Sequence, residues 1–140
     1  NESGADNIGI VVIFRADGAV KNPAIYHTES GEFTKVGYSD NDFIMSSGQY
    51  VIINTYTGKK NAYLLDGVTQ AEIENHKDNY GVIDWDTVIE KYGTVINEYL
   101  DEDGEFIQLQ DGTNTLTYTA DEGTNYLSVS VYYRISYLGV

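Results

Sequence analysis

Two imidazoles, His27 and His76, are the only side chains of this 140-residue sequence that ordinarily act as a general base near neutral pH. A hydrolase triad needs a nucleophile, a histidine and an orienting acid. The sequence has no Gly-x-Ser-x-Gly elbow; His27 lies in an expected strand and His76 in a polar stretch. The chain has no cysteine, which excludes thiol nucleophiles, zinc-thiolate sites and disulfides. The sequence therefore predicts no catalytic residue, no cofactor and no enzyme.

Paired carboxylates are the second chemistry to consider, because two of them facing each other across a cleft can hydrolyse a glycosidic bond. Acidic side chains cluster at 40–42, 101–105 and 121–122. With 22 acidic residues in the chain, such clusters are expected in solvated turns. A glycosidase therefore stays as a third hypothesis, and it requires two carboxylates about 5–9.5 Å apart in one cleft.

A weak calcium pattern lies in the second of these clusters. Asp101, Asp103 and Glu105 alternate around Gly104, as oxygen ligands do in the first half of a calcium-binding loop. The stretch lacks the third alternating ligand and the bidentate Glu that complete such a loop. An Asp-Gly pair is also typical of a β-turn, here one that leads into a strand over 105–110. We therefore expect a turn, with these carboxylates as candidate calcium ligands only if other loops complete the site.

Aromatic side chains are unusually frequent, with thirteen tyrosines and one tryptophan. Such flat, amphipathic side chains stack on sugars and are enriched in protein interfaces. Most of these rings are expected to fill a core. Tyr132 and Arg134 project from the polar side of the last expected strand, and Trp85 begins an expected helix. These three residues are the candidate binding residues.

The elements that position these residues are mainly strands, because most segments alternate apolar and polar residues with a period of two. Pro23 has no N–H to donate, so it should lie at a strand start, an edge or a bulge. A tight turn is expected at 29–31, and Leu127, Val129 and Val131 share one face of a long final strand. Strands are expected over 8–14, 20–28, 32–38, 49–55, 61–66, 115–119 and 127–137. The pattern predicts an all-β, mostly antiparallel domain of about eight strands.

One segment follows a helical period. Trp85, Val88, Ile89 and Tyr92 recur at spacings of three and four, and the pattern continues through Val95, Ile96 and Tyr99. Asp84 is a good N-cap, so a helix is predicted over 84–98, with Gly93 inside it. A shorter helix is expected over 69–76. One or two α-helices are thus inserted into the β domain.

The net charge of −14 narrows the partners. A surface this acidic repels phosphate backbones, so no nucleic-acid partner is expected. No apolar run approaches the roughly 20 residues that span a bilayer, so membrane insertion is not expected either. The length suits one domain over 1–140.

Three ordered motifs resemble the distal tail protein family of long-tailed phages. Asn-Pro-Ala-Ile at 22–25 and Thr-Glu-Ser-Gly-Glu-Phe at 28–33 resemble its Asn-Pro-x-Ile and Thr-x-x-Gly-Glu strand pair. The segment 50–56 with Gly-Lys-Lys at 58–60 resembles its Leu-x-Ile-Asp-Thr strand and basic turn. Residues 106–118 resemble its Phe-x-Leu-x-Pro-Gly-x-Asn-x-Ile-x-Tyr signature. Asp111 replaces the proline, Asn54 replaces the aspartate, and 69–97 enlarges a connection that is often short in the family.

The resemblance implies a galectin-like or jelly-roll-like antiparallel β-sandwich, the C-terminal domain of a longer tail protein whose N-terminal domain builds a hexameric ring. The expected function is a scaffold in a phage or prophage tail tip or baseplate that positions receptor-binding proteins. Its partners would be the receptor-binding protein and the tail hub, and a homo-oligomeric ring is expected only of the full-length protein. Its place would be the virion, after assembly in the cytoplasm of a bacterial host.

A carbohydrate-binding module is the alternative function. A sandwich with exposed aromatic side chains, here Tyr132 and Trp85, suits binding to bacterial cell-wall sugars. In that case the partner would be a host wall saccharide.

Overall fold

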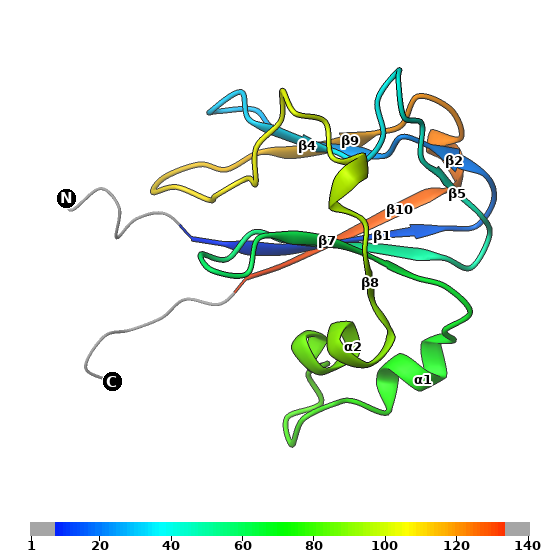
Figure 1. The fold of residues 1–140 in the computed structure, drawn as a ribbon. Helices are drawn as coiled ribbons and strands as arrows, with labels where there is room; N and C mark the ends of the chain where they lie inside the picture. The colour runs from blue at the N-terminus through cyan, green and yellow to red at the C-terminus, as the bar shows by residue number, and fades with distance from the viewer. Residues whose placement is uncertain (1–7, 134–140) are drawn as a thin grey trace.

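The computed structural model describes residues 8–133, whose strands form two main layers (Figure 1). The larger layer is a five-stranded antiparallel sheet with the order β10-β1-β6-β7-β8. Its strands are β1 (Ile10–Ala16), β6 (Tyr50–Asn54), β7 (Asn61–Leu65), β8 (Thr94–Val95) and β10 (Leu127–Tyr133). Among the described residues, β10 pairs with β1 only, so it forms one edge of this sheet.

Two smaller antiparallel sheets, ordered β4-β3-β9 and β2-β5, make the other layer. Their strands are β2 (Val20–Lys21), β3 (Ala24–His27), β4 (Phe33–Lys35), β5 (Ile44–Met45) and β9 (Leu116–Thr119). Figure 1 shows this layer lying over one face of the five-stranded sheet. The predicted all-β sandwich, mostly antiparallel with two helices, is confirmed.

The main core lies between these layers and follows the two-residue period of the strands. Ile10, Val12 and Phe14 alternate along β1 and are almost fully buried. Val51 and Ile53 of β6 join them in the same cluster. β1 and β6 therefore contribute every second residue to the sandwich core.

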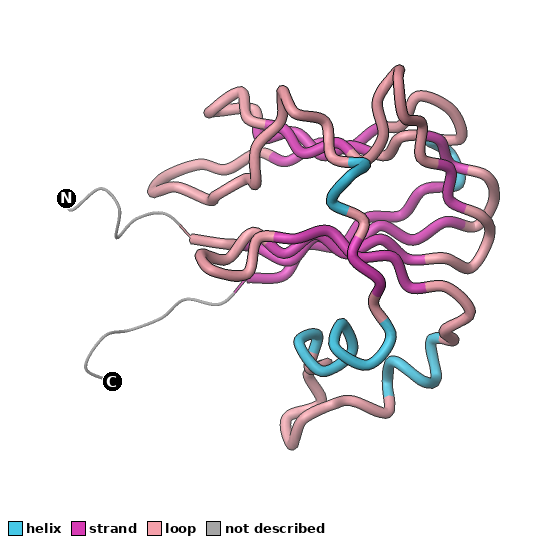
Figure 2. Tube along the Cα trace, in the orientation of Figure 1, coloured by secondary structure: helices cyan, strands magenta, loops and turns pink. Residues whose placement is uncertain are grey.

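A second core lies on the opposite face of the five-stranded sheet. The helices that cover this face are α1 (Gln70–Glu74) and α2 (Trp85–Tyr92), seen below the sheet in Figure 2. Val11 and Ile13 of β1 and Ile52 of β6 pack there against Val88 and Ile89 of α2. This helical layer explains why β1 and β6 are buried along almost their whole length, unlike half-exposed sandwich strands.

Both helices begin at side-chain caps. Thr69 Oγ1 accepts from the N–H of Glu72, and the Glu72 carboxylate accepts from the N–H of Thr69 in return, which is a capping box. Asp84 accepts from the N–H and hydroxyl of Thr87, and these hydrogen bonds lower the pKa of its carboxyl below the ordinary 3.8. The predicted N-cap at Asp84 and the short helix over 69–76 are confirmed, the latter with narrower bounds.

The predicted C-terminal half of the long helix is wrong. The helix ends at Tyr92 because Gly93 takes an extended conformation as its C-cap. Val95 instead belongs to β8, where it pairs with Tyr63 of β7 and is 51 % exposed. Ile96 is buried, but in the sandwich core rather than beneath the helix. Pairing with β7 therefore overrides the helical spacing of the apolar residues.

The expected single strand over 20–28 is divided into β2 and β3. Asn22 lies between them with a φ of 53°, and Pro23 directly precedes β3, so the predicted strand-start position of the proline is confirmed. The hairpin to β4 closes at Gly31, which has a φ of 76° and donates to His27 O. Both local predictions depend on residue types whose backbone preferences are strong.

Two further strand predictions need correction. The segment over 105–110 forms no ladder, only an isolated bridge between Ile8 and Leu109. Its alternation is still meaningful, because Ile107 and Leu109 are buried in the sandwich core. In the final strand Val129 and Val131 pack on that core as predicted, but Tyr133 is 56 % exposed. The predicted continuation over 134–137 lies outside the described residues.

Candidate functional site

Two predicted contact residues, Trp85 and Tyr132, meet at the rim of the helical layer. Their ring centroids are 5.9 Å apart and the ring planes are tilted by 39°. Trp85 begins α2, directly after its N-cap Asp84, while Tyr132 lies near the end of β10. The third candidate, Arg134, lies outside the described residues. The structure thus brings together two aromatic side chains that are distant in the sequence.

These rings belong to the lining of a groove of about 280 Å³, which we call the aromatic groove. The second core draws its sheet residues from β1, β6 and β7 but none from β10, so the helical layer stops short of that edge strand. Ser128, Ser130 and Tyr132 share one face of β10 because they alternate, and this strip stays exposed. The lining residues are Ile13, Arg15, Tyr50, Gln70, Ile73, Glu74, Ile83, Trp85, Ser128, Ser130 and Tyr132.

Arg15 is the cationic group in this groove, and one of its nitrogens has no partner. Its Nη1 lies 3.0 Å from Asp17 Oδ1, and its guanidinium carbon lies 6.0 Å from the centre of the Tyr50 ring. Its Nε is buried and makes no hydrogen bond to any described residue. A buried donor without a partner costs about 1–3 kcal/mol, so the folded chain carries this cost at Arg15.

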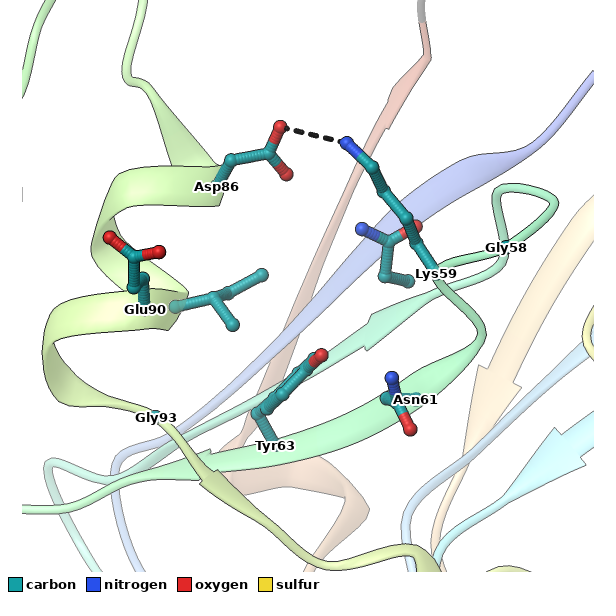
Figure 3. Close-up of a pocket in the computed structure, with 9 residues that line it drawn as sticks. Gly58, Lys59, Asn61, Tyr63, Asp86, Glu90 and Gly93 are labelled. Carbon is teal, nitrogen blue, oxygen red and sulfur yellow. Dashed lines mark hydrogen bonds and ion pairs between the residues drawn. The ribbon is translucent and has the colours of Figure 1, made fainter.

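A second hollow, of about 510 Å³, lies between α2 and the β6–β7 turn (Figure 3). Lys59 Nζ from the turn lies 3.3 Å from Asp86 Oδ2 on the helix, and Tyr63 lies between the two elements. Asp86 and Glu90 are the two carboxylates of this hollow, and both come from one face of α2. Two carboxylates on the same wall do not flank a substrate, so this hollow does not have the glycosidase arrangement.

His27 is buried at the end of β3 and is the centre of a polar network. Its Nδ1 lies 2.7 Å from Ser30 Oγ, and its Nε2 lies 2.7 Å from Asn114 Oδ1. Glu29 Oε1 is 3.7 Å from the same Nε2. Thr115 donates to the Glu29 carboxylate from its N–H and its hydroxyl, and these hydrogen bonds lower the pKa of Glu29 below the ordinary 4.5.

Ser30, His27 and Asn114 lie in the order of a nucleophile, a base and an orienting group. Their hydrogen bonds, however, connect two loops to each other. The N–H of Ser30 donates to His27 Nδ1, that of Gly31 donates to His27 O, and that of Glu32 donates to Ser30 Oγ. These amides are therefore occupied and offer no oxyanion hole beside Ser30. The other histidine, His76, follows α1 and packs edge-on against Tyr92. The His27 ring thus joins the turn at Ser30 to the loop at Asn114.

The candidate calcium ligands form a turn rather than a ligand set. Asp101 Oδ1 accepts from the N–H of Asp103 at 2.9 Å, and Asp101 O accepts from Gly104 N, as the predicted turn requires. Glu105 instead accepts from the N–H of Phe33. Across residues 8–133, no group of three or more His, Cys, Asp or Glu side chains is arranged to hold a metal ion.

Two carboxylates, those of Asp42 and Asp121, lie close together on either side of the Asn22 side-chain amide. Asn22 Nδ2 donates to Asp42 Oδ1 and to Asp121 Oδ2, both at 2.9 Å. Lys35 Nζ also lies 3.0 Å from Asp121 Oδ1. The hydrogen bonds from Asn22 and Lys35 lower the pKa of Asp121 below 3.8. This network holds together the corner between β2 and β3, and it leaves no free pair of carboxylates.

Several residues of these sites were missed by sequence reasoning. Arg15, Ser128 and Ser130 line the groove without belonging to any motif. The alternation of the final strand predicts that Ser128, Ser130 and Tyr132 share one face. It does not predict that β1 is the neighbouring strand. Lys59 lies in the basic Gly-Lys-Lys turn, which was noticed only for its resemblance.

Comparisons with known proteins add no family: no family model, no curated protein and no solved structure matches the chain. Within the described part of the chain, neither helix has the length and apolar character needed to cross a membrane.

Proposed function

We propose that this chain is a non-enzymatic structural domain of a phage or prophage tail tip or baseplate, which presents surfaces to the tail hub and to receptor-binding proteins. The motifs that resemble the distal tail protein family support this proposal because their residues form turns and strand-to-strand contacts of the sandwich. Asn22 and Pro23 make the corner before β3, and Gly31 closes the next hairpin. Thr55, after β6, accepts from Ile10 N at 2.7 Å through its buried hydroxyl. In this proposal the full-length protein forms the ring, and the domain belongs to the virion.

The observation that carries the proposal is a stretch with few charges in a strongly acidic chain. In the stretch 112–133, Asp121 and Glu122 are the only charged residues, although the net charge of the chain is −14. Tyr118, Tyr126 and Tyr133 of this stretch are each about half exposed. Interface centres are depleted of charge and enriched in tyrosine. We call 112–133 the charge-poor side.

The backbone of β10 adds to this surface. As an edge strand it presents every second N–H and C=O outward, and edge strands in proteins that stay monomeric are commonly protected by charges or proline. Leu127–Tyr133 contains neither. A strand from a neighbouring tail protein can therefore extend the five-stranded sheet at this edge.

The test is tail assembly in a phage that carries the gene. Tyr118→Glu puts a charge on the charge-poor side, and Ser47→Glu puts one on the exposed β5–β6 turn as a matched control. We expect the first variant to lower the incorporation of the protein into tails and the control to leave it unchanged. Deletion of 20–140 should abolish normal assembly and adsorption, and normal particles after that deletion would contradict the proposal.

A carbohydrate-binding module for bacterial cell-wall sugars is the second candidate, and the aromatic groove is the observation that favours it. Trp85 and Tyr132 lie there beside hydroxyl and guanidinium groups, the mixture of stacking and hydrogen-bonding groups that a sugar requires. Titration of the chain with purified wall polysaccharides, with and without calcium, tests this candidate. Binding is expected, and a flat titration would count against it.

A further inference from the structure

We infer that the aromatic groove binds one ring of a neutral saccharide, stacked on Tyr132 and Trp85 and hydrogen-bonded by Arg15 and the serines of β10. This inference rests on the second candidate function and gives it a place and a ligand class. It does not depend on the charge-poor side acting as a protein interface.

The stacking surface comes from the two rings. Tyr132 is 44 % exposed, and Trp85 leans against it at 39° instead of covering it. Aromatic faces are electron-rich and attract the C–H groups that a sugar ring presents on its less polar face. Because the helical layer holds Trp85 and the sheet holds Tyr132, the platform is formed before any ligand arrives.

The hydrogen-bonding groups lie on the floor of the same groove. Arg15 and Ser128 are direct partners across β1 and β10, as are Ile13 and Ser130. The two serine hydroxyls are exposed and make no hydrogen bond to another described residue. The Arg15 side chain lines the groove and is 42 % exposed, so its guanidinium can donate to a ligand there. Sugar hydroxyls both donate and accept, so they match a floor with one guanidinium and two rotating hydroxyls.

The charges of the lining favour a neutral ligand. The positive charge of Arg15 is already balanced by Asp17 at 3.0 Å, and the negative charge of Glu74 is balanced by Lys77 at 3.6 Å. The rest of the chain is strongly acidic, which opposes the approach of phosphate-rich or carboxylate-rich polymers. The volume of about 280 Å³ lies just below the range of roughly 300–1,000 Å³ for drug-sized ligands, so it suits a single ring.

Trp85 supplies a direct readout because it is the only tryptophan in the chain. We would record its fluorescence while adding glucose, galactose, rhamnose or N-acetylglucosamine to the 140-residue chain, each up to about 10 mM, since single sugars bind with millimolar Kd values. Glucuronic acid and glycerol 3-phosphate serve as anionic probes. A saturable change with at least one neutral sugar and none with the anions is the expected result.

Variants locate the site, with affinities measured by calorimetry so that the readout does not depend on the tryptophan. Tyr132→Ala should weaken binding about tenfold, whereas Tyr132→Phe keeps the ring and should bind normally. Arg15→Lys keeps the charge but loses the planar guanidinium donors, and it should also weaken binding. Tyr118→Ala removes an equally exposed tyrosine from β9 and should leave binding unchanged. Thermal unfolding establishes that each variant is folded.

The failures can be told apart. If only the anionic probes bind, the inferred neutral ligand class is wrong. Calorimetry could detect a neutral sugar that changes neither the Trp85 fluorescence nor its own affinity on Tyr132→Ala. The sugar would then bind elsewhere, and the groove assignment would be overturned. If no sugar of either class binds, the inference and the second candidate function fail together, and the scaffold proposal is untouched.

Discussion

The ring of Trp85, the first residue of α2, packs against the ring of Tyr132 in the edge strand β10, with centroids 5.9 Å apart. This contact joins the helical layer to a strand that the helices do not otherwise cover. It turns the uncovered strip of β10 into one wall of a groove. The helical segment over 69–97 is thus the part that creates this surface.

The second core predicts the effect of truncating Ile89. This side chain is 8 % exposed and packs between α2 and the five-stranded sheet, so Ile89→Ala should lower the free energy of unfolding by about 2–4 kcal/mol through the cavity left behind. Val95→Ala is the matched control, because Val95 is half exposed in β8 and its truncation should cost less than about 0.5 kcal/mol. Urea denaturation measures both. Equal costs would mean that the helix does not pack on the sheet.

Alanine substitutions at two glycines with positive φ, Gly112 and Gly123, distinguish the cost of backbone strain from the cost of a steric clash. Gly112 has a φ of 92°, and a Cβ added there would meet only open space, so Gly112→Ala should cost only the conformational strain, about 1–2 kcal/mol. At Gly123, with a φ of 81°, a Cβ would clash with the backbone oxygen of Ala19, so Gly123→Ala must also move the backbone. We expect Gly123→Ala to have the lower melting temperature. The reverse order would contradict the close approach of the loop before η3 (Thr124–Tyr126) to β2.

Acid should weaken the corner that Asp121 stabilises. The pKa of Asp121 is lowered below 3.8 in the folded chain, chiefly by Asn22 and Lys35, so its contribution is present above pH 3.8 and is lost as the pH falls through the folded pKa. Asp121→Asn removes this titration. The variant should be less stable than the wild type at pH 7 and should lose less stability on acidification from about pH 5 to about pH 2. Parallel pH profiles of the two proteins would contradict this role.

The network around His27 predicts its tautomer. The N–H of Ser30 donates to Nδ1, so the ring proton should be on Nε2, where it donates to Asn114 Oδ1. Long-range ¹⁵N–¹H spectra of the imidazole distinguish the two tautomers. A proton on Nδ1, where it would donate to Ser30 Oγ, would contradict this assignment.

Elements with strong local preferences could be predicted from the sequence. Asp84 was identified as a cap because a short acceptor precedes an amphipathic run, and Gly31 as a turn because glycine tolerates a positive φ. The strand over 50–54 followed from its continuous apolar character, since both of its faces are buried. These features need no knowledge of the partner strand.

Features that depend on distant partners could not be predicted. The helical spacing continues past Gly93 only because Val95 and Ile96 serve a strand and the other core. Trp85 and Tyr132 were both candidates, yet their contact depends on β10 lying beside β1 at the rim of the helical layer. The unpartnered Nε of Arg15 likewise follows from packing and from no motif.

The central proposal is that the chain belongs to a phage tail tip, and its location in the particle tests this most directly. Antibodies against the chain would be applied to tail particles from a strain that carries the gene, and the label would be located by electron microscopy. The proposal predicts label at the distal end of the tail. Label absent from intact particles, in cells that express the protein, would contradict it.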